Sequence, residues 1–469
     1  MSSSDESSAR GHRGGQWADR ARGLIRREEL RAFARRSREV IVLAAITGAF
    51  TGAGVALFDR AVVDWVYGHL VDQSRWILAF LPLAGLALAA AVLRWVALGA
   101  DPDSADAYLH AFHDADHPLR LREAPGKMLA ALATLGFGGA MGLEGPSLYL
   151  GASIGTFLQQ KLRRLAGNVD RRLLLVAGAA AGVAAIFKAP ATGAVFALEV
   201  PYHDDLARRM LLPALVAGGT SYLTFVAING TDPILTVHGN PRLAFAELAG
   251  AVALGLLAGV GARGFAWLLR RAKELSRRTA PALRILAGGL SLAGIFAVGE
   301  LLTDRSITIG VGYDAIAWAL DPGRAVWLIV VILLLRCLAT ASTVAAGGVG
   351  GLFIPLVVAG ALLGRGVGGI VGDLDTSLFL VIGVAAFLGA GYRVPLAAVM
   401  FVAESTGRPG FVVPGLLAAV AAELVMGRSS VSTYQRATVP VAPTPPDAPP
   451  DPPPDPPPDP PPGPPRPPG

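Results

Sequence analysis

The sequence is short of cysteine and of charged residues, and each shortage excludes a class of protein. Cys337 is the single cysteine among 469 residues and lies in an apolar run, which excludes an intrachain disulfide and a thiolate metal site. Charged residues make up only 16% of the chain, whereas 53% of the residues are hydrophobic. A soluble protein needs more polar side chains than this to cover its surface. The composition therefore predicts a membrane protein.

The apolar residues are concentrated in long runs that carry almost no charge. Roughly 20 helical residues cross the hydrocarbon core of a bilayer, and several of the runs reach or approach this length. The runs cover residues 40–58, 76–98, 285–302, 325–335 and 377–390. The sequence therefore predicts an all-α, multi-pass protein of the cell membrane.

Arginine is concentrated in the segments between these runs. Residues 1–38 are polar and Arg-rich and lack an apolar stretch followed by a cleavage site, so we expect no signal peptide. Positively charged flanks are retained on the inner side of a membrane, which predicts cytoplasmic N- and C-termini and cytoplasmic linkers at 161–172 and 270–284. The net charge of +6 is accounted for by this topology pattern, and we expect no nucleic-acid partner.

Three segments follow along the chain. Residues 1–38 form a basic cytoplasmic segment, and residues 39–436 form a membrane domain. Residues 437–469 form a tail whose stretch PPDAPPDPPPDPPPDPPPGPP is Pro-rich with interspersed Asp and has no apolar side chains to bury, so the tail is expected to be disordered and of polyproline type. We expect a spacer rather than a docking motif there, and its partner, if it has one, is unknown. No folded regulatory domain is expected after the membrane domain.

The membrane domain contains an internal repeat. Three motifs occur twice in the same order: Gly142-Leu-Glu-Gly-Pro146 with Gly151 and Gly155 against Gly351-Leu-Phe-Ile-Pro355 with Gly360 and Gly364; Lys188-Ala-Pro190 leading to Glu199 against Arg393-Val-Pro395 leading to Glu404; and Gly99 to Asp101 against Gly310 to Gly312. These pairs divide the domain into halves at about 40–230 and 242–426. Gly- and Pro-interrupted apolar segments at matching places predict two inverted-topology repeats whose broken, re-entrant helices meet at the midplane.

A helix that starts inside a membrane can bind an anion. Its first N–H groups are unpaired and its dipole is positive at that end, so several such starts can replace the water shell of an anion. Gly allows the backbone to approach the ion closely. Pro has no N–H, but in the first turn of a helix that N–H would have no partner within the helix, so nothing is lost. Segments 99–102, 142–146 and 351–355 have this character. Each one alone could be a kink or a close helix contact, but three in paired order favour anion sites.

These motifs resemble those of the chloride channel and transporter (CLC) family. Residues 142–146 resemble its GxEGP segment and residues 351–355 its GxFxP segment, and stretches 187–199, 310–316 and 393–407 resemble further family segments. The resemblance covers most of 40–436 and implies a homodimer in the lipid bilayer with one pathway for small inorganic anions in each subunit. It implies no enzyme activity and no cofactor, with chloride as the transported ion.

The resemblance also assigns site residues. Glu144 matches the gating glutamate, which can occupy the anion site as an anion mimic; a buried ion pair is the alternative. The implied anion-binding positions are Gly142, Leu143, Gly145, Gly351, Leu352, Phe353, Ile354, Tyr434 and Ala100. Tyr434 matches the inner tyrosine of the family, although it could instead be an interfacial anchor.

Two departures from the family pattern bear on function. Ala100 stands where the family usually has a serine that donates to the anion, and Asp101 and Asp103 lie beside it, as cavity-facing carboxylates or as caps of a short helix. Val200 stands at the inner proton-transfer glutamate, one residue after Glu199, which should point away from the same route. The sequence thus predicts voltage- or pH-gated anion transport that is channel-like or weakly proton-coupled, with a chloride/proton antiporter as the alternative.

Two other patterns suggest different chemistry. Gly151-Ala-Ser-Ile-Gly155 fits the GxSxG pattern of serine hydrolases, but a rhomboid-like protease needs a facing His, so small-residue helix packing around Ser153 is favoured. The segment that holds His110, His113 and His117 has metal-like spacing and includes Asp106, Asp114 and Asp116. A solvated cytoplasmic loop without a metal is the favoured interpretation, with a weak divalent regulatory site as the alternative.

Overall fold

The computed structural model describes residues 38–114, 116–162, 170–233, 235, 237, 243–321, 323–371 and 376–438. These residues are helical or irregular, and their only β pairing consists of isolated bridges. The basic segment before residue 38, most of the Pro-rich tail and part of the 161–172 linker lie outside the described residues. The predictions for those segments stay predictions.

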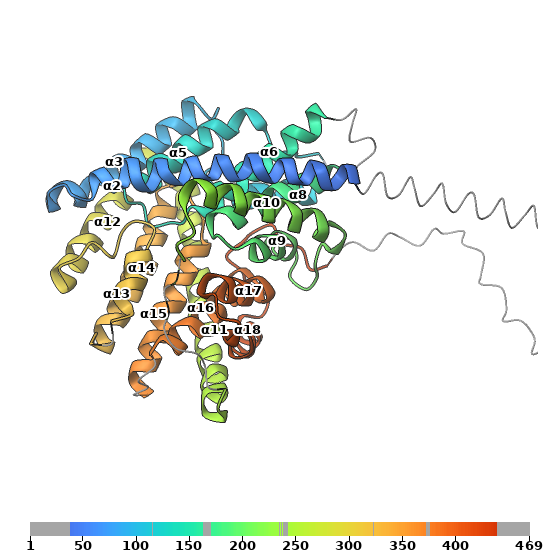
Figure 1. Cartoon of the computed structure of the whole chain (residues 1–469). Helices are drawn as coiled ribbons and strands as arrows, with labels where there is room; N and C mark the ends of the chain where they lie inside the picture. Colours follow the sequence, from blue (N-terminus) through green and yellow to red (C-terminus); the bar gives the residue numbers. More distant parts are fainter. Residues whose placement is uncertain are drawn as a thin grey trace, which may run out of the picture.

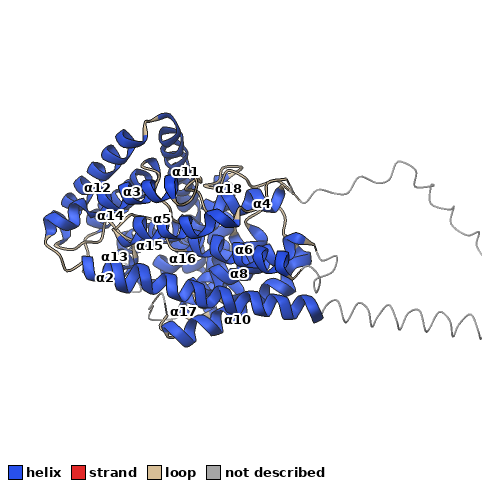
Figure 2. Ribbon diagram, turned by 90° about the horizontal axis from the view of Figure 1, so that it is seen from above, coloured by secondary structure: helices blue, strands red, loops and turns tan. Residues whose placement is uncertain are grey.

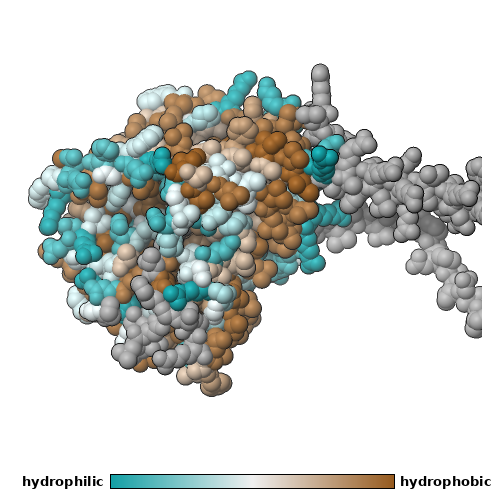
Figure 3. Space-filling view, in the orientation of Figure 1, coloured by the Kyte–Doolittle hydropathy of each residue, from teal (hydrophilic) through white to brown (hydrophobic). Residues whose placement is uncertain are grey.

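The helices of the described residues confirm the membrane prediction. Eight of them are long and apolar enough to cross a bilayer. Large hydrophobic side chains on these helices are exposed, including Trp76, Leu301 and Leu424, each more than three-quarters exposed. Figure 3 shows broad apolar areas on the surface. Such surface is unfavourable in water and suits contact with lipid.

The two halves contain corresponding elements in the same order (Figures 1 and 2). The first half has the span Arg38–Leu70, which includes η1 (Ala61–Tyr67) and α2 (Gly68–Leu70), then α3 (Arg75–Trp95), α4 (Ala105–His113), η2 (Leu121–Glu123), α5 (Ala124–Gly136), α6 (Glu144–Lys161), α8 (Arg171–Ile186), α9 (Pro190–Glu199), η3 (Arg208–Met210) and α10 (Leu211–Asn229). The second half has α11 (Phe245–Arg278), α12 (Pro281–Thr303), α13 (Tyr313–Ala319), α14 (Val326–Ala345), α15 (Phe353–Val371), α16 (Thr376–Tyr392), α17 (Pro395–Thr406), η4 (Pro409–Phe411) and α18 (Val412–Met426).

The packing of the halves is also repeated. In the first half α8 contacts α6, α9 and α10, and in the second half α16 contacts α15, α17 and α18 in the same way. The halves meet through pairs of equivalent helices, namely α3 with α12, α6 with α15, and α9 with α17. In Figure 1 α9 and α17 lie close together near the centre. The two inverted repeats predicted from the sequence are confirmed by this arrangement.

The repeated glycines bring helices of one half into close contact. A Cβ atom added to Gly151 of α6 would lie 2.0 Å from the carbonyl oxygen of Gly178 on α8. The equivalent position in the other half, Gly360 of α15, would place a Cβ atom 2.4 Å from the carbonyl oxygen of Gly383 on α16. Ser153 is buried beside this contact. The GxSxG pattern therefore serves helix packing, as the sequence predicts.

We expect Gly151→Ala to destabilise the protein by about 1–3 kcal/mol, because the added methyl group must push two backbones apart. Gly219→Ala on α10 is the matched control, since nothing lies within 4 Å of the added Cβ atom. Thermal unfolding of both variants in one detergent measures the difference. A Gly151→Ala variant as stable as the control would show that α6 and α8 do not pack this closely.

Candidate anion-binding site

Two glycine loops from opposite halves pair in the interior of the protein. The N–H of Gly142 donates to the carbonyl of Gly351 at 2.9 Å, and the N–H of Gly351 donates back to the carbonyl of Gly142 at 2.7 Å. The pair forms an isolated antiparallel bridge. This bridge fixes the segment before α6 against the segment before α15.

Two threonines make a second reciprocal connection between the same loops. Thr134 on α5 accepts a hydrogen bond at its Oγ1 from the N–H of Val349, at 3.0 Å. Thr343 on α14 accepts one at its Oγ1 from the N–H of Ala140, at 3.1 Å. Each half therefore satisfies a buried backbone donor of the other half. These threonines carry no motif of their own, although they align when the repeat is extended backward from the glycine motifs.

The bridge places two helix starts beside each other. Helix α6 begins at Glu144 and α15 begins at Phe353, each two residues after its bridging glycine. The first N–H groups of a helix have no partner within the helix, and the helix dipole is positive there. Pro146 and Pro355 occupy these first turns and contribute no N–H. The remaining backbone donors can hold one negative charge between the two helices.

That position is occupied by the carboxylate of Glu144. Its Oε1 accepts the N–H of Phe353 at 2.5 Å, so the side chain reaches from the start of α6 to the start of α15. The residue is only 3% exposed. Its Oε2 is buried and has no hydrogen-bond partner in the described part of the chain, and no ion pair found there includes Glu144. The geometry therefore disfavours the alternative of a structural ion pair.

Glycine is required at both bridge positions because the carboxylate fills the adjoining space. A Cβ atom at Gly142 would lie 1.9 Å from Oε2 of Glu144, and one at Gly351 would lie 2.0 Å from Oε1. A Cβ atom at Gly145 would lie 2.8 Å from the Cα atom of Gly351. Any larger residue would displace the carboxylate or separate the loops.

An aromatic cluster lies on one side of this site. Phe353 is fully buried, and its ring centroid lies 4.3 Å from that of Phe187, 5.1 Å from Phe401 and 5.4 Å from Phe196. Tyr392 packs on Phe196, with the two ring centroids 5.5 Å apart. Tyr392 is not among the residues predicted from the sequence, because a tyrosine at the end of an apolar helix carries no motif of its own.

The other two predicted site residues, Ala100 and Tyr434, lie apart from Glu144. They line a cavity of about 370 Å³ together with Tyr149. Tyr434 is 44% exposed, and its ring packs against His110 at 4.9 Å. The structure thus brings the two glycine loops together and brings Ala100 and Tyr434 together, as two separate groups.

A lysine pairs with one of the two acids beside Ala100 and with a third acid nearby. Lys273 of α11 contacts Asp106 at 2.8 Å and Asp103 at 3.2 Å. Burial raises the pKa of Asp106, but the Lys273 ammonium and the hydroxyls of Thr433 and Ser432 outweigh it, so the pKa is lowered and the carboxylate stays ionised.

Neither of the two predicted acids caps a helix through its side chain. Asp101 accepts the N–H of Asp103 at 3.0 Å. The N-cap residue of α4 is Ser104, whose side chain makes no capping hydrogen bond. Asp101 and Asp103 both line the cavity, which favours the cavity-facing alternative over the capping one.

A family comparison agrees with this geometry. The family described as "Voltage gated chloride channel" matches residues 85–427, well over half of the chain. The chain belongs to the CLC family. The family's description is that of a chloride channel, and the eight apolar helices of the described residues agree with a multi-pass membrane protein.

Curated relatives match most of the chain. The H(+)/Cl(-) exchange transporter ClcA of Citrobacter koseri is 28% identical over 406 residues, which cover 82% of this chain and 85% of that protein. The transporter of the same name from Salmonella paratyphi B is 27% identical over 425 residues, covering 86% and 89%.

Solved CLC structures share the fold. A slow cyanobacterial Cl-/H+ antiporter superposes with a TM-score of 0.73 at 22% identity, covering 83% of this chain and 94% of that one. A CLC-type fluoride/proton antiporter superposes with a TM-score of 0.71 at 23% identity, covering 85% and 98%.

Replacing Gly142 with Ala should displace the Glu144 carboxylate, because the three nearest atoms to the added Cβ all belong to that side chain. The same methyl group would clash with a chloride ion in the place of the carboxylate, and losing one charge-assisted hydrogen bond costs about 1.5–3 kcal/mol, so we expect chloride to bind about tenfold or more weakly than in the wild type. Isothermal titration of chloride into purified protein measures the change.

Two further variants make this test specific. Gly366→Ala on α15 is the control, because the nearest atom to its added Cβ lies 3.9 Å away. The double variant Gly142→Ala/Glu144→Ala should bind chloride less tightly than Glu144→Ala alone, since the added methyl group still fills the place of the anion after the carboxylate has been removed. A well-folded Gly142→Ala protein with wild-type chloride affinity would contradict the assignment of this position to the anion.

Proposed function

We propose that the protein exchanges chloride for protons across the membrane, with Glu144 acting both as an anion mimic and as a proton carrier. The position of the Glu144 carboxylate between the starts of α6 and α15 carries this proposal. The names of the curated relatives, which are H(+)/Cl(-) exchange transporters, support the coupled form of transport. This differs from the channel-like transport that the sequence analysis favours.

In this proposal chloride binds where the carboxylate now lies. The donors are backbone N–H groups of the two glycine loops, among them that of Phe353. The proposed binding positions are those predicted from the sequence: Gly142, Leu143, Gly145, Gly351, Leu352, Phe353 and Ile354. An anion in this place is surrounded by fixed dipoles that replace its water shell without reorganisation.

The proton step follows from the charge of Glu144. A negative carboxylate is held by the helix starts, whereas a protonated one loses that attraction and leaves the site to an anion. The unsatisfied Oε2 makes the occupied state less favourable than a fully paired carboxylate would be. One group thus exchanges places with chloride and takes up or releases a proton as it does so.

The cavity lined by Ala100 and Tyr434 is, in this proposal, the cytoplasmic entrance to the site. Tyr392, at the end of α16, packs on Phe196 of the aromatic cluster that borders the buried site. Ala100 leaves the entrance without the side-chain donor that the family usually has. On the resemblance alone, we also propose a homodimer with one pathway in each subunit and cytoplasmic termini.

Val200 favours a second candidate, namely anion transport without proton coupling. It is buried and cannot carry a proton at the expected inner position. The neighbouring Glu199 accepts the N–H groups of Leu396 at 3.1 Å and Ala397 at 2.8 Å, and so is engaged at the start of α17. Coupling in this chain must therefore use another proton path, such as a chain of water molecules.

Proton flux in reconstituted vesicles distinguishes the two candidates. When a chloride gradient is imposed, we expect protons to move uphill in proportion to chloride flux. Glu144→Gln should still conduct chloride but lose both proton movement and pH dependence, because the amide cannot be ionised. Parallel chloride-electrode and pH-electrode recordings measure both fluxes.

The possible results separate the candidates clearly. Chloride flux without proton movement in the wild-type protein would establish the uncoupled pathway that Val200 favours. PH dependence that persists in a folded Glu144→Gln protein would place the gate elsewhere. Collapse of a cation gradient with no anion flux would exclude chloride transport by this chain.

A further inference from the structure

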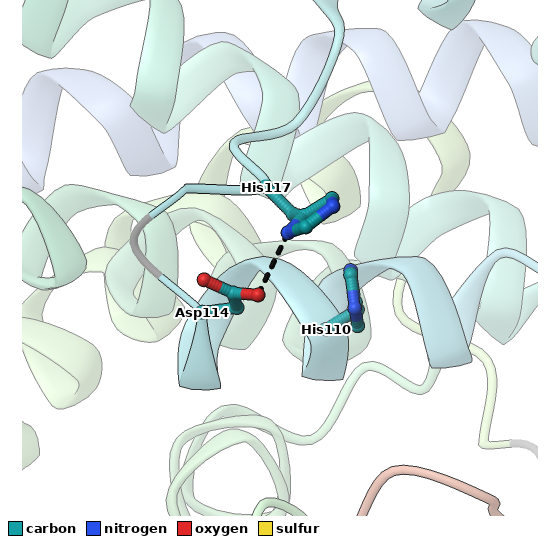
Figure 4. Close-up of side chains that lie close together, drawn as sticks. All are labelled: His110, Asp114 and His117. Carbon is teal, nitrogen blue, oxygen red and sulfur yellow. Dashed lines mark hydrogen bonds and ion pairs between the residues drawn. The ribbon is translucent and has the colours of Figure 1, made fainter.

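Three side chains with metal-binding groups meet at the far end of α4, outside the site of Glu144. His110 lies in the last turn of the helix, Asp114 is its C-cap residue, and His117 follows in the loop. One ligand atom from each lies within 4.8 Å of the others. Nδ1 of His117 is 2.7 Å from Oδ2 of Asp114, and the rings of His110 and His117 are 4.8 Å apart (Figure 4).

The local backbone produces this cluster. The N–H of Asp114 donates to the carbonyl of His110 at 2.9 Å, which closes the last helical turn and places the two residues on one face. The N–H of Asp116 donates to Oδ1 of Asp114 at 2.9 Å, which turns the chain back. His117 is thereby returned toward His110. His113 takes no part, because its Nε2 contacts the carbonyl of Pro201 at 2.8 Å.

Two imidazoles and one carboxylate are a typical ligand set for a late first-row divalent ion. Zn²⁺ binds such ligands at about 2.0–2.2 Å, and sites with three protein ligands leave a fourth position for water. Tetrahedral ligands at that distance lie about 3.4 Å apart, and the three present ligand atoms lie within 4.8 Å of one another. Mg²⁺ and Ca²⁺ prefer all-oxygen sites and fit poorly here.

We propose that His110, Asp114 and His117 bind a divalent transition-metal ion such as Zn²⁺, and that the bound ion slows anion passage. The regulatory part rests on the proposed function, because it requires the cavity to be an entrance for anions. The metal site itself does not rest on the proposed function, because it depends only on the three ligand groups and their spacing.

The position of the cluster explains the effect on transport. The ring of His110 contacts His117 on one side and Tyr434 on the other, and all three residues line the same cavity as Ala100. A bound ion would fix His110 and the loop to which His117 belongs, and with its water ligand would fill part of the approximately 370 Å³ available. Both effects narrow the path to Ala100.

Titration of zinc into purified, tag-free, full-length protein tests the site. We expect one saturable zinc ion per subunit. Loss of an outer-shell partner alone weakens metal binding by about 10- to 100-fold, so His110→Gln and His117→Gln should each weaken it by at least about tenfold. Asp116→Asn is the matched control, since it removes a charge from the same loop but no ligand, and it should bind zinc like the wild type. Magnesium should give no saturable binding.

A flux assay tests the regulation separately. Vesicles receive zinc on both sides, and each variant is compared with its own zinc-free chloride flux. Zinc should lower flux in the wild type and in Asp116→Asn but leave His110→Gln/His117→Gln unaffected. Size-exclusion profiles and unfolding temperatures in zinc-free buffer establish that each variant is folded.

The two assays separate the ways in which the proposal can fail. No zinc binding by the wild type, or equal binding by the folded histidine variants, would overturn the site. Zinc binding that depends on both histidines without any change in flux would overturn the regulation. Zinc binding in a protein that moves no chloride would support the site and contradict the proposed function instead.

Discussion

The fold depends on the need to satisfy backbone N–H groups where helices begin in the protein interior. An unpaired buried donor costs free energy comparable to a lost hydrogen bond. At the starts of α6 and α15 the acceptor is the Glu144 carboxylate, and the glycines at 142 and 351 are needed to make room for it. The paired loops and the two threonine hydroxyls hold the helix starts in this position.

The same need is met differently at α9 and α17. Glu404 at the end of α17 accepts the N–H groups of Ala191 and Thr192 at the start of α9, and Glu199 at the end of α9 accepts two at the start of α17. Each of these carboxylates uses both oxygens, so each helix start has a permanent cap from the other half. Glu144 has one oxygen without a partner in the described part of the chain. Removing the Glu144 carboxylate from its helix starts therefore costs less free energy than removing Glu199 or Glu404. An anion site requires such a removable cap.

The sequence predicted those features that repeat in local motifs. Lys188 and Arg393 occupy matched motif positions, and both have the left-handed backbone, with φ of 50° and 58°. The matched Gly99 and Gly310 also have positive φ, 80° and 69°. Local motifs do not predict the contacts between the halves, because these contacts depend on how the halves dock. They include the exchange of threonine hydroxyls, the position of Tyr392 and the caps from Glu199 and Glu404. The variant Gly142→Ala tests one such contact, which the motif alone does not specify.

The pseudo-symmetry of the frame makes the difference between Glu144 and Phe353 informative. Glu144 and Phe353 are equivalent, since each is the first residue of its helix and follows its bridging glycine by two. Two carboxylates here would repel each other across a single site, and one of them would have to be protonated. Two aromatic residues would leave the buried N–H groups without an acceptor whenever the anion departed. One acid opposite one aromatic ring gives a single removable acceptor beside a rigid apolar wall, so a symmetric frame can hold one exchangeable negative charge.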